Sequence, residues 1–106
     1  MTKQIMIIAD YTRMEALNLQ ELCETCQISS NFAYELLEYG ILQPVGEHPD
    51  EWQFDLKQLH RVKTTLRLHH DLEINLAGIA LILDLLDEID NLQAKNEFLE
   101  KQFLQF

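Results

Sequence analysis

Residues 18–40 read NLQELCETCQISSNFAYELLEYG, and this stretch decides the fold. Asn18 can cap a first helix, LQELCETC, whose leucines and cysteines share one apolar face. After a brief turn, Ser29 or Ser30 can cap a second helix that runs to Tyr39, and Gly40 supplies a left-handed stop. Two short helices joined by a tight turn predict a helix-turn-helix.

The charge of the second helix does not suit an element that reads DNA. This helix contains no Lys or Arg, and it carries Glu35 and Glu38. The chain of 106 residues has a net charge of −10, and residues 1–56 hold ten acidic and two basic side chains. Because duplex binding depends on Lys and Arg that neutralise phosphates, we expect no direct binding of nucleic acid, and an anionic membrane is disfavoured for the same reason. The charge favours a partner with a basic face.

The stretch after the second helix predicts a small β-hairpin, a wing. Ile41 and Leu42 suit a short strand, and residues 52–54 alternate as the return strand. Trp52 and Phe54 would then share one face as core anchors, because a small domain needs large apolar residues to close. The loop between the strands is marked by Pro44, Gly46 and Pro49.

A third helix is expected to begin after Asp55 and to run to about residue 70 or 72. It carries the one basic cluster of the chain, which we interpret as a solvated face that can also pair with acidic neighbours. The cluster consists of Lys57, Arg61, Lys63 and Arg67.

A long fourth helix follows Asn75 and shows a heptad-like apolar seam. After residue 92 the seam is thin and flanked by charges, so one small domain cannot bury it, and we expect a homodimer with a coiled-coil-like interface. A monomer in which the helix folds back is the alternative. The expected dimer contacts are Ile82, Leu85, Ile89, Leu92, Asn96, Leu99 and Phe103.

These elements divide the chain into three parts. We expect an N-terminal arm or short strand over residues 1–16, a winged helix-turn-helix domain over 17–72 and a C-terminal dimerisation helix over 73–106. The apolar run IMIIA at residues 5–9 is too short for a signal peptide, and the run LAGIALIL at 76–83 is too short to span a bilayer. A cytoplasmic protein is therefore expected.

The sequence shows no pattern of a catalytic or cofactor site. It has only three glycines and no phosphate-binding loop, so we expect neither an enzyme nor a bound cofactor. Cys23 and Cys26 are interpreted as apolar filling, with a redox pair or half a zinc site as the alternatives; no His is spaced as a partner, so no metal is expected.

Acidic and aromatic side chains are the expected contacts with a basic partner. They are Tyr34, Glu35 and Glu38 on the second helix, Glu47, Asp50 and Glu51 on the wing, and Asp84, Asp87 and Glu88 on the fourth helix.

Two stretches carry a resemblance to a known family. The run RLHHDLEINLAGIALILDLLDEIDNL at residues 67–92, together with the helix-turn-helix and the GIL and WQFD segments at 40–42 and 52–55, resembles the CbpM chaperone modulator family. That family belongs to the MerR-like winged-helix group, so the resemblance implies a mainly α-helical fold and a dimer through the C-terminal helix. It also implies binding to the J-domain of CbpA, a DnaJ-type co-chaperone, and inhibition of its stimulation of a DnaK-type chaperone.

The chain departs from the wider group at two places. Cys26-Gln27 stands where a Thr-Gly turn is common, which predicts a strained or looser turn. Leu76-Ala77 stands where some members carry an aromatic-Pro pair, which bears on how the third and fourth helices join.

Two other functions stay open on the sequence. A MerR-like transcription regulator is favoured by the basic cluster on the third helix but opposed by the acidic second helix. A structural coiled-coil adaptor is the other alternative.

Overall fold

The computed structural model describes residues 16–104, and its helix-turn-helix follows the caps in the sequence. Helix α2 spans Leu19–Cys26, and Asn18 and Glu21 exchange hydrogen bonds of 2.8 and 3.0 Å in a capping box. Helix α3 spans Ser30–Glu38, with the Ser29 hydroxyl accepting a 3.1 Å hydrogen bond from the Phe32 amide. The two predicted helices are therefore confirmed, and α3 ends one residue before Tyr39.

The turn between α2 and α3 is tight although it lacks glycine. Gln27 adopts a left-handed conformation with φ of 57°, and the Ile28 amide donates to the Cys23 carbonyl at 3.0 Å. A left-handed conformation costs a non-glycine residue about 1 kcal/mol. The expected looser turn is thus wrong, and the strained alternative is the one observed.

The predicted β-hairpin wing is wrong, because residues 16–104 contain no β-strand. The amides of Ile41 and Leu42 both donate to the Leu36 carbonyl, at 2.9 and 3.2 Å, so they complete the C-terminus of α3 instead of pairing with a strand. The wing is instead a loop closed by one antiparallel bridge between Val45 and Gln53, with amide-to-carbonyl distances of 3.0 and 3.1 Å. A short 3-10 helix, η2, spans Pro49–Glu51 within it.

A second bridge fastens the start of the described chain to the end of the wing. Leu17 and Phe54 exchange two backbone hydrogen bonds of 2.8 Å, and both side chains lie in the core. The prediction for residues 1–16 lies almost entirely outside the described residues.

Helix α4 spans Leu56–Asp71 and closes the core over α2 and α3. The Asp55 carboxylate caps it by accepting from the Gln58 amide at 3.1 Å, as predicted. Phe54 is fully buried at the centre of this core, whereas Trp52 is only half-buried against it. The core residues are Leu17, Leu22, Cys26, Leu36, Ile41, Leu42, Phe54, Leu59, Val62, Leu76, Ile79 and Leu83.

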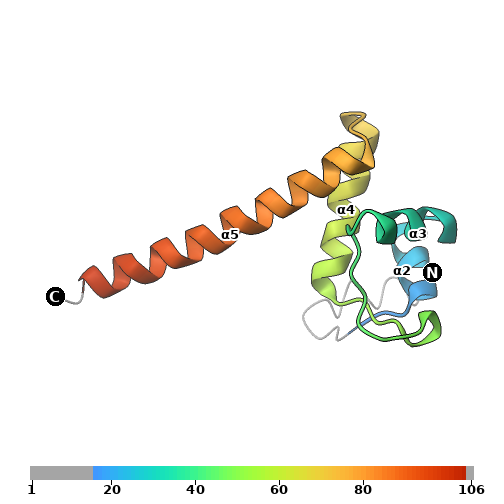
Figure 1. Cartoon of the computed structure of the whole chain (residues 1–106), viewed down its shortest axis with the longest axis horizontal. Coiled ribbons are helices and arrows are strands. Elements are labelled where there is room, and N and C mark those ends of the chain that lie inside the picture. The colour runs from blue at the N-terminus through green and yellow to red at the C-terminus, as the bar shows by residue number, and fades with distance from the viewer. Residues whose placement is uncertain (1–15, 105–106) are drawn as a thin grey trace.

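Helix α5 spans Leu76–Leu104 and leaves the domain as a long arm (Figure 1). Its first turn is capped by Asn75, whose side-chain oxygen accepts from the Gly78 amide at 2.8 Å. The short link from α4 turns through Glu73, which has φ of 53°. Only Leu76, Ile79 and Leu83 of α5 are buried, and every described residue from 88 onward is exposed. None of the helices described is long and apolar enough to cross a membrane.

Candidate partner-binding face

Helix α3 presents its polar side to solvent because its apolar side is used by the core. Ala33 and Leu36 are fully buried. The predicted contacts Tyr34, Glu35 and Glu38 are all exposed. At about 100° per residue, Glu38 lies about 40° round the helix from Tyr34, and Glu35 lies about 100° round from it. These three side chains are therefore available to a partner.

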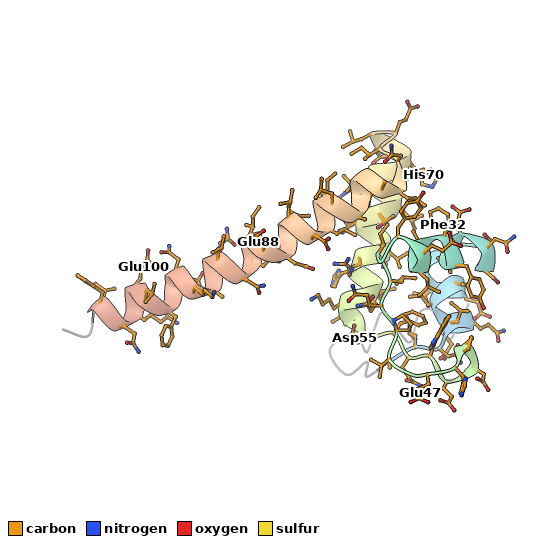
Figure 2. All side chains as sticks on the ribbon, viewed as in Figure 1. Phe32, Glu47, Asp55, His70, Glu88 and Glu100 are labelled. Atoms are coloured by element: carbon orange, nitrogen blue, oxygen red, sulfur yellow. The ribbon has the colours of Figure 1, made fainter. Side chains whose placement is uncertain are left out.

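The wing positions a second group of carboxylates. Gly46 has φ of 127°, and a Cβ at this position would lie 3.0 Å from the Glu51 carbonyl oxygen. Both the backbone conformation and the close approach of Glu51 therefore favour glycine here. The tight closure leaves Glu47, Asp50 and Glu51 exposed, and Figure 2 shows Glu47 at the outer edge of the loop.

An aromatic contact connects α3 to the wing. The ring of Tyr34 lies 6.1 Å from that of Trp52, and Trp52 in turn lies edge-on to Phe54 at 6.5 Å. The sequence predicts Trp52 as a core anchor, and Trp52 does pack against the core. Its alternation with Phe54 gives no sign that it is also partly exposed. The Tyr34–Trp52 pair joins the exposed sides of two elements into one surface, which we call the acidic face. It consists of Tyr34, Glu35, Glu38, Glu47, Asp50, Glu51 and Trp52.

The elements that carry this face contribute no positive charge of their own. No Lys or Arg occurs between residues 14 and 56, which include all of α2, α3 and the wing. Like charges held together on a surface create a potential that attracts a cationic partner. The acidic face can therefore bind a basic surface but would repel phosphate.

The predicted patch on α5 is divided by an internal ion pair. Asp84 and Glu88 are exposed, but the Asp87 carboxylate lies 3.0 Å from Nη1 of Arg61. Arg61 is itself buried, and its Nε donates to the Ile41 carbonyl at 2.7 Å. The sequence pattern groups Arg61 with the solvated basic residues and allows for pairing with acidic neighbours. The polar residues Gln58 and Thr65 on the same side of α4 give no sign in the sequence that this side is buried.

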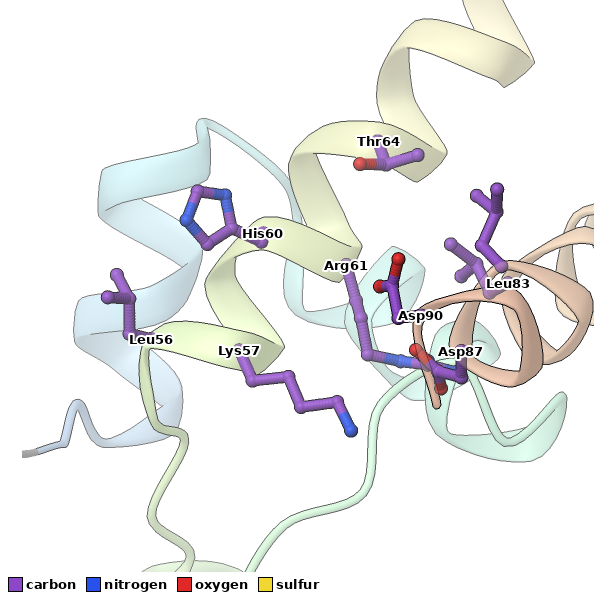
Figure 3. Close-up of a pocket in the computed structure, with 9 residues that line it drawn as sticks. Leu56, Lys57, His60, Arg61, Thr64, Leu83, Asp87 and Asp90 are labelled. Carbon is purple, nitrogen blue, oxygen red and sulfur yellow. The ribbon is translucent and has the colours of Figure 1, made fainter. Parts of the chain in front are cut away.

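This ion pair lies beside a groove of about 500 Å³ between α4 and α5 (Figure 3). Lys57 and His60 lie on the α4 wall and Asp90 on the α5 wall, so the groove is of mixed charge. Lys57, Lys63 and Arg67 of the predicted basic cluster are exposed on α4.

The predicted seam on α5 lies on the side of the helix that faces away from its own domain. Leu85, Ile89, Leu92 and Leu99 are each about half exposed or more, and Phe103 is 81% exposed. Ile82 is partly buried and Asn96 is exposed, with its amide directed to Glu100 at 3.4 Å.

The two cysteines lie on α2 as protonated thiols. Burial raises the pKa of Cys26 to about 11, and neighbouring Lys63 lowers it only in part. Burial, followed by the charge of Glu24, also raises the pKa of Cys23. Because thiolates are the reactive and metal-binding form, these environments favour the structural role. Among residues 16–104, no group of three or more His, Cys, Asp or Glu is placed to hold a metal ion.

Comparison with known proteins agrees with this architecture. Residues 17–101 match the family model described as "MerR HTH family regulatory protein". The chaperone modulatory protein CbpM of Coxiella burnetii (strain Dugway 5J108-111) is 37% identical over 101 residues, which cover 95% of each chain. The chain belongs to the CbpM family. The CbpM of Pseudomonas entomophila is 34% identical over 95 residues, which cover 90% of this chain and 94% of that relative. The similarity therefore includes α5 as well as the helix-turn-helix.

Proposed function

We propose that this member of the CbpM family binds the J-domain of a CbpA-type, DnaJ-like co-chaperone and inhibits its stimulation of a DnaK-type chaperone. The name of its relatives, chaperone modulatory protein, supports a role in modulating chaperones. The observation that carries the proposal is the acidic face, because a helix-turn-helix that binds DNA carries basic residues where this chain carries five carboxylates.

The proposed mechanism is direct competition. A J-domain uses a basic helix to engage its DnaK-type chaperone, and a protein that covers this helix prevents the encounter. The exposed Glu38 on α3 and Glu47, Asp50 and Glu51 on the wing supply the opposite charge. Complementary charge raises the association rate and fixes the orientation of the partners more than it raises the affinity.

The second part of the proposal is that the chain is a homodimer through α5. A monomer rarely leaves a long apolar strip open to water, and the seam of Leu85, Ile89, Leu92 and Leu99 is such a strip. Because the residues that bind α5 to its own domain lie on the opposite side of the helix, a second copy can cover the seam without displacing the domain. Asn96 within the seam would cost stability but help to fix the register.

Calorimetric titration with the J-domain of the CbpA-type co-chaperone from the same organism tests the proposal. Binding that weakens with salt supports it, and the absence of binding at low and high salt contradicts it.

One observation favours a second function, DNA binding. Lys57, Lys63 and Arg67 are exposed on α4 and could contact phosphates. An electrophoretic titration with duplex DNA at low salt tests this alternative, and no binding there would eliminate it.

A further inference from the structure

The Tyr34–Trp52 ring contact joins the α3 part of the acidic face to the wing part. Trp52 rests on the fully buried Phe54, with ring planes at 81°, and its amide donates to the Pro49 carbonyl at 3.4 Å. Tyr34 reaches it from α3 with a ring separation of 6.1 Å, while 43% of Tyr34 stays exposed. Two aromatic rings from different elements thus meet at the surface in the absence of a partner.

The carboxylates nearest to this pair along the chain favour a cation over an apolar group. Glu38 lies one turn after Tyr34 on α3, and Asp50 and Glu51 directly precede Trp52 in the wing. The faces of aromatic rings attract ammonium and guanidinium groups within about 6 Å, and carboxylates at the edge of the rings add to this attraction. No Lys or Arg occurs in α3 or in the wing, so neither element supplies a cation of its own to the rings.

We infer that the Tyr34–Trp52 pair is the anchor point for one Arg or Lys side chain of the partner's basic helix. This inference rests on the proposed function, since it names the group that the J-domain helix would place on the acidic face. The rings would cover the flat side of the cation while Glu38, Asp50 and Glu51 accept hydrogen bonds from its edge. A guanidinium fits best, because it is planar and donates in two directions.

The inference separates two contributions to binding. The carboxylates act over a distance and set the salt dependence, whereas the rings act only on contact. Removing the Tyr34 ring should therefore weaken binding without changing the slope of affinity against salt. Reversing the carboxylates should change that slope.

Trp52 is the only tryptophan of the chain, so its fluorescence reports on this place directly. The experiment titrates this 106-residue chain with a J-domain that contains no tryptophan, and follows both the heat of binding and the Trp52 emission. The variants are Tyr34→Leu, Tyr34→Phe and, as a matched control, Tyr39→Leu. Tyr39 is a similarly exposed tyrosine at the C-cap of α3, outside the ring contact with Trp52.

We expect the Trp52 emission to change in step with the heat signal. Tyr34→Leu should raise the Kd about fivefold to tenfold, while Tyr34→Phe, which keeps the ring, and Tyr39→Leu should stay within about twofold of the unmodified protein. If heat is released but the emission is constant and Tyr34→Leu binds as tightly as before, the anchor inference is overturned and the proposed function stands. If no heat is released and the emission is constant, the proposed function fails together with it.

Discussion

Arg61 of α4 and Asp87 of α5 form an ion pair with a nitrogen-to-oxygen distance of 3.0 Å. Arg61 also donates from Nε to the Ile41 carbonyl at 2.7 Å, so one side chain connects the segment after α3 to the part of α5 where the helix leaves the domain. Together with Leu76, Ile79 and Leu83, this contact sets the direction in which α5 leaves the domain.

Substitution of Arg61 is therefore expected to destabilise the protein. Arg61→Leu leaves the Ile41 carbonyl without its donor and should lower the free energy of unfolding by about 2–3 kcal/mol. Asp87→Asn should cost only about 1 kcal/mol, because the Asp87 side chain is 40% exposed and water can replace much of the contact. Urea unfolding at fixed protein concentration measures both values. Arg67→Leu, on the exposed side of α4, is the control and should change stability by less than about 0.5 kcal/mol.

Gly46 should be required for the shape of the wing. Gly46→Ala places a Cβ 3.0 Å from the Glu51 carbonyl oxygen at a φ of 127°, which an L-residue rarely adopts. The backbone must shift, so we expect a loss of about 1–3 kcal/mol in stability and a slower association with the J-domain. Unfolding and stopped-flow binding measure the two effects. Gly40→Ala is the comparison: its φ of 73° is also strained, but a Cβ there meets no atom within 4 Å. An unchanged association rate for Gly46→Ala would show that the wing does not contribute to the encounter.

Charges placed in the seam of α5 should dissociate the proposed dimer. Leu92→Asp and Leu99→Asp each put a carboxylate where two apolar surfaces would meet, and both should give monomers in sedimentation velocity experiments. Phe98→Asp is the matched control, because Phe98 is also a large exposed apolar residue of α5 but lies outside the heptad positions. A dimer that persists in both seam variants would show that the interface lies elsewhere.

The raised pKa of Cys26 predicts a distinct pH profile for thiol labelling. Only the thiolate reacts with iodoacetamide, so the rate at Cys26 in the folded protein should keep rising about tenfold per pH unit until the pH approaches about 11. In the urea-unfolded chain the same rate should level off near pH 9, because burial no longer opposes ionisation. Peptide mass spectrometry of timed samples distinguishes Cys26 from Cys23. A folded-state rate that is already constant at pH 8 would show a reactive thiol and would reopen the redox alternative.

The helices were predictable because their signals are local. Each described α-helix is capped by the side chain of the residue before it, through a hydrogen bond to an amide three residues later. The capping residues are Asn18, Ser29, Asp55 and Asn75. The wing was not predictable in detail. Ile41 and Leu42 have the composition of a strand, but both of their amides donate to the Leu36 carbonyl near the end of α3 instead of pairing with another strand.

The candidate face was predictable only in its charge. The absence of Lys and Arg between residues 14 and 56 is visible in the sequence, and so are the carboxylates. The contact of Tyr34 with Trp52 and the ion pair of Arg61 with Asp87 join residues 18 and 26 positions apart, and no periodic pattern links them. Such pairs depend on how α3, the wing, α4 and α5 pack together.

The most direct test of the central claim is a calorimetric titration of the J-domain at low and high salt, with the unmodified protein and with two double variants. Glu35→Lys with Glu38→Lys reverses charge on α3, and Asp84→Lys with Glu88→Lys reverses the same amount on α5. We predict tight binding of the unmodified protein that weakens with salt, a loss of at least tenfold for the α3 variant and a smaller loss for the α5 variant. Equal affinity of the α3 variant and the unmodified protein at low salt would contradict the claim that this acidic face reads a basic protein surface.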